Sequence, residues 1–121
     1  MKFPRLAGIA LAVAVPAAGA YDYPTSERVY YVLDCMQKLG GESMENLAVC
    51  SCRIDHIAER ISYEDYDAGV LYERYQPMPG EKGAMFREGA MPRQAKGALH
   101  QAAEQAEHDC PAVRRVTRKA P

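Results

Sequence analysis

The sequence has no tryptophan, only two phenylalanines, and no pair of cysteines spaced C-x-x-C. It therefore lacks the usual motif of paired zinc knuckles, of thioredoxin-like redox centres and, as C-x-x-C-H, of covalent haem attachment. It also lacks an excess of charge, because 15 Lys and Arg stand against 16 Asp and Glu. A chain without a large positive field is not expected to bind nucleic acid, since that binding depends on neutralising phosphates.

Catalytic patterns are missing as well. The sequence contains no Ser-His-acid order, no paired-carboxylate pattern and no G-x-x-x-x-G-K-[ST] phosphate loop. These absences favour a protein that is not an enzyme and that holds no cofactor.

Long apolar segments are scarce, with one exception near the N-terminus. Lys2 and Arg5 precede an apolar core, residues 6–15, and the small residues 18–20 follow it. This pattern is typical of a secretory signal peptide, and the core is shorter than the roughly 20 apolar residues of a membrane-spanning helix. We expect cleavage of residues 1–20, which takes Lys plus Arg from 15 to 13 against 16 Asp plus Glu, a net charge of about −3. The remaining domain, 21–121, is then periplasmic or secreted, with no membrane attachment.

The rest of the chain is typical of an all-α protein, a small disulfide-stapled bundle of about four helices. Glycine and proline breaks separate segments of helical periodicity, and no strand pattern is present. A long loop, Gln76–Pro92, contains three prolines and three glycines. A flexible basic tail is expected at about 112–121. The expected helices are Thr25–Leu39, Ser43–Ile61, Ser62–Tyr75 and Pro92–Asp109.

Apolar residues recur at helical spacing and predict the faces that turn toward the core. Thr25 and Ser62 are the expected N-caps of the first and third helices. Gly69 weakens the third helix by up to about 1 kcal/mol relative to alanine. The predicted core faces are Val29, Val32, Leu33, Met36 and Leu39 in the first helix, Leu47, Cys50, Ile54, Ile57 and Ile61 in the second, and Ala95, Leu99, Ala102, Ala106 and Cys110 in the last.

Four cysteines remain after signal cleavage, and an even number in a small exported domain predicts disulfides. Cys50 and Cys52 lie two residues apart in an expected helix, so their side chains point roughly 200° apart and do not bridge each other. The favoured pairing is Cys35–Cys50 with Cys52–Cys110. The alternative exchanges partners, giving Cys35–Cys52 with Cys50–Cys110.

Two alternatives assign chemistry to these cysteines. Cys52 and His56 lie one helical turn apart and are ligand types that zinc or copper(I) accepts, so a metal carrier is the second hypothesis. A thiol–disulfide oxidoreductase is the third, although such enzymes normally carry C-x-x-C at a helix N-terminus.

A partner-binding surface is expected around the long loop. Lys82, Phe86 and Arg87 lie in "PGEKGAMFR", and Tyr72 and Tyr75 precede it at helical spacing. Aromatic and arginine side chains are common in protein contacts because they bury area while keeping a polar group.

The run "YYVLDCMQKLGGESMENLAVCSCRIDHIAERISYEDY", residues 30–66, followed by "PGEKGAMFR", resembles a group of small exported proteobacterial proteins with the cysteine pattern C…CSC…C and no assigned activity. The resemblance implies an accessory role beside periplasmic quinoprotein dehydrogenases, and it carries no catalytic residue onto this chain. Together these observations predict a periplasmic or secreted binding or accessory protein with an unknown periplasmic partner.

Overall fold

The structure is a computed structural model that describes residues 22–113, with the backbone alone at 90–92. The predicted signal peptide and residues 114–121 of the predicted tail lie outside the described residues. The described chain is all-helical, as predicted, and it contains five helices where about four were expected. They are α1 (Thr25–Lys38), α2 (Met44–Arg60), α3 (Tyr63–Tyr75), α4 (Glu81–Glu88) and α5 (Ala90–Asp109).

The additional helix, α4, lies inside the segment that was predicted to be a loop. Gly80 turns the chain into it with φ +83°, and Gly83 is buried against the preceding turn. In the sequence, glycines at both positions indicate a loop. At Gly83, however, the missing side chain lets α4 pack against the backbone of Met78.

Hydrogen bonds from backbone N–H groups to serine hydroxyls define two of the helix starts. Ser43 Oγ accepts from Asn46 N at 3.0 Å, and Ser62 Oγ accepts from Asp65 N at 3.1 Å. The N-cap predicted at Ser62 is therefore confirmed. The one predicted at Thr25 is wrong, because Pro24 occupies that position and Thr25 is the first helical residue. Proline is compatible with a helix start, where the first N–H groups have no intrahelical partner.

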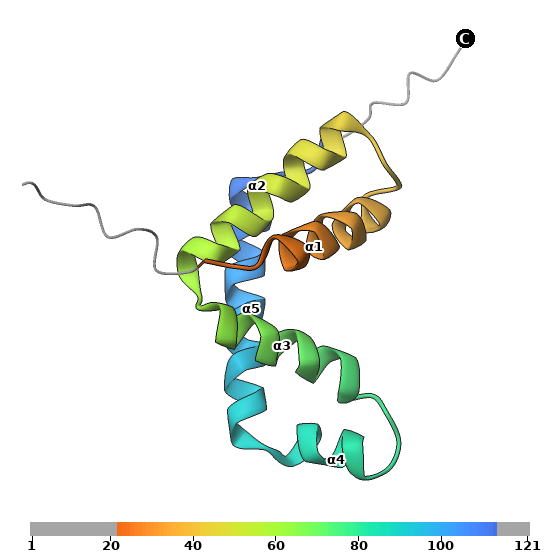
Figure 1. Cartoon of the computed structure of the whole chain (residues 1–121), viewed down its shortest axis with the longest axis vertical. Helices are drawn as coiled ribbons and strands as arrows, with labels where there is room; N and C mark the ends of the chain where they lie inside the picture. The colour runs from red at the N-terminus through yellow and green to blue at the C-terminus, as the bar shows by residue number, and fades with distance from the viewer. Residues whose placement is uncertain (1–21, 114–121) are drawn as a thin grey trace, which may run out of the picture.

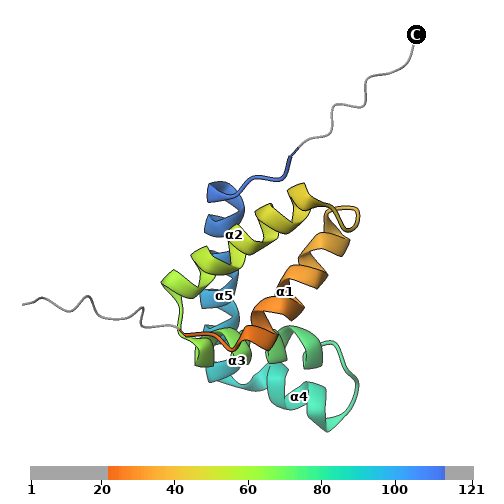
Figure 2. The same cartoon turned by 45° about the horizontal axis from the view of Figure 1, so that its top comes forward.

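The helices are arranged around α5, the longest of them. Figure 1 shows α2 crossing one half of α5 and α3 crossing the other half, with α1 folded back along α2 as a hairpin. In both views, α4 joins α3 to α5 at the end of the molecule opposite to α2 (Figures 1 and 2). α5 thus connects the α1–α2 hairpin, which packs on one half of it, to the α3–α4 pair, which packs on the other half.

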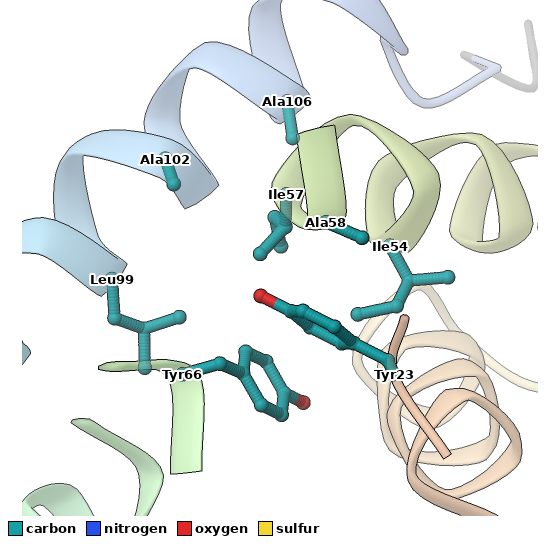
Figure 3. Packing of buried hydrophobic residues seen from close by; sticks show 8 residues of the cluster. All are labelled: Tyr23, Ile54, Ile57, Ala58, Tyr66, Leu99, Ala102 and Ala106. Carbon is teal, nitrogen blue, oxygen red and sulfur yellow. The ribbon is translucent and has the colours of Figure 1, made fainter. Parts of the chain in front are cut away.

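The main core lies where α2, α3 and α5 meet. Figure 3 shows Ile54 and Ile57 of α2 facing Tyr66 of α3 and the buried side of α5. All five predicted core residues of the last helix are buried, so this prediction is confirmed. Four of its five are alanine or cysteine, and such small side chains let α5 lie close to its neighbours.

Tyr23 completes this core from the segment before α1. Its side chain is almost fully buried, and its hydroxyl donates to the carbonyl of Ile61 at 3.0 Å. Its ring lies 5.5 Å from the ring of Tyr63 and 4.9 Å from that of Tyr66, between centroids. The extended N-terminal segment is therefore held across the junction of α2 and α3. The sequence did not predict a core position for Tyr23, because this residue lies outside any periodic pattern.

The predicted core face of α1 is only partly correct. Met36 is buried beside Cys35 and Cys50, but Val29 and Leu33 are exposed. Leu47 of α2 is also exposed, although the spacing placed it in the core. The physical reason is that α1 packs mainly against one helix, so only a narrow strip of its apolar surface is covered.

Candidate functional site

Two disulfides hold α2 to its neighbours. Cys35–Cys50, here called the hairpin disulfide, links α1 to α2 with the Cα atoms 5.8 Å apart. Cys52–Cys110, the terminal disulfide, links α2 to the C-terminal end of α5 with the Cα atoms 6.1 Å apart. This is the favoured one of the two pairings that the sequence left open, and the exchanged pairing is not present. Cys50 and Cys52 point to different neighbours because they lie on opposite sides of α2.

A buried arginine supports the terminal disulfide. Arg53 is 9% exposed, and its Nε donates to the carbonyl oxygen of Cys110 at 3.0 Å. Cys110 ends α5 by donating its own N–H to Ala106 O at 2.8 Å. The backbone N–H and carbonyl of Cys110 are therefore both hydrogen-bonded, which holds this residue in place beside α2.

His56 lies beside the terminal disulfide, one turn along α2 from Cys52. A ring nitrogen of His56 and the two sulfur atoms all lie within 4.8 Å of one another. Cys110 is buried, whereas Cys52 and His56 are partly exposed. The structure therefore brings the two residues of the metal hypothesis together and adds Cys110, a third potential ligand that the sequence analysis assigned only to a disulfide.

Charged groups surround the His56 ring on its Nδ1 side. Asp109 Oδ2 lies 3.6 Å and Glu59 Oε2 3.7 Å from Nδ1, while Arg60 Nη1 lies 3.3 Å away. Arg60 is itself paired with Asp109, its Nη2 donating to Oδ2 at 2.8 Å. The guanidinium charge is thus balanced by the carboxylate next to it.

The charge state of Asp109 follows from its hydrogen bonds. His108 and Gln105 contact its Oδ1, each at 3.2 Å, and Arg60 contacts its Oδ2. These hydrogen bonds hold the pKa of the Asp109 carboxyl below its usual value, and the bond with His108 has the largest effect. The carboxylate next to His56 is therefore ionised at neutral pH.

In its oxidised form this cluster has one limitation as a metal site. Zinc and copper(I) bind thiolates, and both sulfur atoms are used in the disulfide bond. The metal hypothesis therefore applies only to a reduced form of the protein. The oxidoreductase hypothesis stays a prediction.

A second candidate surface lies at the turn between α3 and α4. The rings of Tyr75 and Phe86 are stacked with centroids 5.3 Å apart, and both are partly exposed. Met85 is 72% exposed and Met78 is 40% exposed. Lys82, also exposed, lies one turn before Phe86 on α4. We call these five residues, Tyr75, Met78, Lys82, Met85 and Phe86, the tip surface.

Two residues of the predicted partner surface have other positions. Tyr72 is only 7% exposed, with Lys96 Nζ of α5 5.3 Å from its ring centroid, so its ring is part of the α3–α5 packing and not of an exposed surface. Arg87 is exposed, but its Nη1 donates to the carbonyl oxygens of Gln76 and Met78, both at 2.9 Å. These bonds satisfy carbonyls after the end of α3 and hold α4 against the turn.

A further set of exposed apolar side chains lies on the α1–α2 hairpin. The set is Val29, Tyr30, Leu33, Met44 and Leu47. This surface was not predicted, because helical periodicity assigned Val29, Leu33 and Leu47 to the core. Amphipathic spacing alone does not show whether a neighbouring helix covers the apolar face.

Comparison of the chain with protein-family models, with curated proteins and with solved structures gives no significant match. Within residues 22–113, none of the helices combines the length and the apolar character that crossing a membrane requires.

Proposed function

We propose that this chain is a small exported binding or accessory protein, without catalytic activity of its own, that contacts a protein partner through the tip surface. The observation that carries this proposal is the stacked, partly exposed Tyr75–Phe86 pair, with the exposed Met78 and Met85 close to it in sequence. Aromatic and methionine side chains are enriched in protein interfaces, and the rims of interfaces are polar and solvent-accessible. Lys82 beside this apolar group fits that arrangement.

The position of the tip surface suits a contact role. It lies at the end of the molecule opposite to α2 (Figures 1 and 2), and Lys82 and Met85 are exposed there. Gly83 and Arg87 hold α4 against the preceding turn, so the aromatic pair is presented by a supported element. A surface ordered before binding loses less conformational entropy on association.

The two disulfides are compatible with an oxidising compartment outside the cytoplasm. We place the protein in the periplasm on the additional basis of the signal-like sequence at 1–20. The resemblance to exported proteobacterial proteins suggests an oxidoreductase of that compartment as the partner, with the present chain in an accessory role.

Site-specific photo-cross-linking in the producing cells tests this proposal. A photoreactive phenylalanine analogue is placed at Met85, with matched positions at Leu33 on the α1–α2 hairpin and at Glu104 on the exposed side of α5. We expect one discrete cross-linked species from Met85 and none from Glu104. Phe86→Ala, which removes half of the stacked pair, should abolish it.

Several results would count against the proposal. Equal cross-linking from all three positions indicates non-specific contact, and cross-linking from Leu33 alone assigns the interface to the hairpin. A species from Met85 that persists in Phe86→Ala shows that the aromatic pair does not form the interface. Mass spectrometry of the species then identifies the partner, and a cytoplasmic protein would contradict the assigned compartment.

A further inference from the structure

The cluster at the terminal disulfide combines three side chains that bind soft and borderline metal ions. Cys52 and His56 project from the same side of α2, one turn apart, and Cys110 reaches them from the end of α5. The three ligand atoms already lie within 4.8 Å of one another. In the described part of the chain, the hairpin disulfide belongs to no such group.

We propose that reduction of the terminal disulfide converts this cluster into a zinc site formed by Cys52, His56 and Cys110. A dithiol reductant transfers two electrons and two protons, so the Cys52–Cys110 bond breaks and the reductant forms its own disulfide. Zn²⁺ then displaces the two thiol protons and binds both thiolates and a ring nitrogen of His56. Solvent occupies the fourth position, as in other sites with three protein ligands.

The movement required is small. In tetrahedral coordination with Zn–S bonds of about 2.3 Å, two sulfur ligands lie about 3.8 Å apart. The sulfur atoms are 2.03 Å apart in the disulfide, so each has to move by roughly 1 Å. Rotation of the two cysteine side chains supplies this movement without displacing α2 or α5, whose Cα atoms at these positions are 6.1 Å apart.

The surroundings of the cluster favour a bound cation after reduction. The carboxylates of Asp109 and Glu59 near His56 Nδ1 can orient the ring, as outer carboxylates do for histidine ligands of metals. Arg60 is the cation beside the ring, and Asp109 already pairs with it. Two thiolates formed next to these groups add negative charge that a divalent ion neutralises.

Accessibility distinguishes the two disulfides. Cys35 and Cys50 are both buried, whereas Cys52 and His56 are partly exposed. Reductant and metal can therefore approach the terminal disulfide more easily than the hairpin disulfide. The site would respond to the redox state of its compartment. It binds zinc once a dithiol has reduced the bond, and it releases zinc when a disulfide-bonded oxidant takes two electrons from the thiolates, re-forms Cys52–Cys110 and is itself reduced to a dithiol. This inference is independent of the tip surface, and failure of either leaves the other standing.

The test compares the purified exported protein before and after reduction with a phosphine. Each form is titrated with Zn²⁺, and with Co²⁺ as a spectroscopic probe. We expect the reduced protein to bind one ion and to show the visible bands of tetrahedral cobalt together with a thiolate-to-cobalt charge-transfer band. The oxidised protein should show neither.

Three variants assign the ligands. His56→Ala should lower zinc affinity by more than about tenfold, because even loss of an outer-shell partner costs 10–100-fold. His100→Ala is the matched control, since His100 is exposed on α5 and pairs with Glu104, and it should bind as the unmodified protein does. The double variant Cys35→Ala/Cys50→Ala removes the hairpin thiols and should retain the site.

The proposal is overturned if the oxidised protein binds zinc as tightly as the reduced one, or if the reduced protein shows no thiolate-to-cobalt band when Co²⁺ is added. It is also overturned if the zinc affinity of reduced His56→Ala equals that of the unmodified protein. Reduction could also lower the helical content of the protein, and far-UV circular dichroism measures that change. Zinc must then restore the helical signal of the unmodified protein to the level of the oxidised form, and it must not do so in His56→Ala. Absence of that restoration also overturns the proposal.

Discussion

Replacing Gly69 by alanine should destabilise the protein, although alanine is the better helix former. Gly69 lies in α3, buried against α5. A Cβ at this position would lie 2.9 Å from both Cβ and Cδ2 of Leu99 and 3.0 Å from the carbonyl oxygen of Ala95. Two of these three atoms, the Leu99 Cβ and the Ala95 oxygen, belong to or adjoin the α5 backbone and cannot swing aside. The helices must therefore separate to accept one methyl group.

The expected magnitude is the difference between two terms. Alanine gains about 1 kcal/mol of helix propensity over glycine. Overpacking of a core costs about 1–3 kcal/mol, and rigid neighbours place this site near the upper value. The free energy of unfolding should thus fall by about 2 kcal/mol, which lowers Tm by about 8–16 °C for a domain of this size.

Gly97→Ala is the matched control. Gly97 lies in α5 but is exposed, and nothing comes within 4 Å of a Cβ placed there. This variant should gain up to about 1 kcal/mol. Denaturant unfolding followed by circular dichroism measures both changes. If Gly69→Ala stabilises the protein as Gly97→Ala does, α3 and α5 do not pack closely enough for a Cβ at position 69 to meet Leu99 and Ala95.

Three further predictions concern individual contacts. Replacing Cys52 and Cys110 together by alanine should lower the free energy of unfolding by about 4 kcal/mol, and removing the hairpin disulfide should lower it by about 3 kcal/mol. The difference arises because the terminal disulfide closes a loop of 58 residues and the hairpin disulfide one of 15. Denaturant unfolding measures both losses, and equal losses would contradict the chain-entropy argument. Arg53→Leu should cost about 1–3 kcal/mol by leaving the carbonyl of Cys110 without its buried donor, and an unchanged unfolding midpoint would show that water replaces it. Burial raises the pKa of the Tyr66 phenol above its ordinary value of 10.0. Above that pH the unfolded phenol loses its proton while the folded one keeps it, so stability should fall as pH rises past about 10, and Tyr66→Phe should make this alkaline loss shallower in a pH-dependent unfolding series.

The accuracy of the sequence-based predictions varied from element to element. α2, α3 and α5 were predicted well because each has strong local signals, such as the Ser62 cap and the buried face of α5. α4 was missed because its glycines, read locally, indicate a loop. Val29 and Leu33 were assigned to a core that does not extend to them. Periodicity identifies an apolar face, but it does not show what lies against that face.

The candidate site divides in the same way. The spacing of Cys50 and Cys52 alone excludes a bond between them, so each must pair with a different cysteine. This follows from the fixed rotation per residue of an α-helix, which is a local property. The sequence also places Cys52 and His56 on one side of α2. By contrast, the presence of Cys110, Asp109 and Arg60 around His56 depends on where the end of α5 lies.

The sequence by itself determined that this chain is helical and which faces of its helices are apolar. These properties follow from interactions within one or two helical turns. Only the tertiary structure decided that Tyr23 closes the core, that Tyr72 is buried while Met85 is exposed, and that His56 lies beside the terminal disulfide. Each of these depends on packing between segments distant in sequence, where small side chains on α5 set how closely the helices approach.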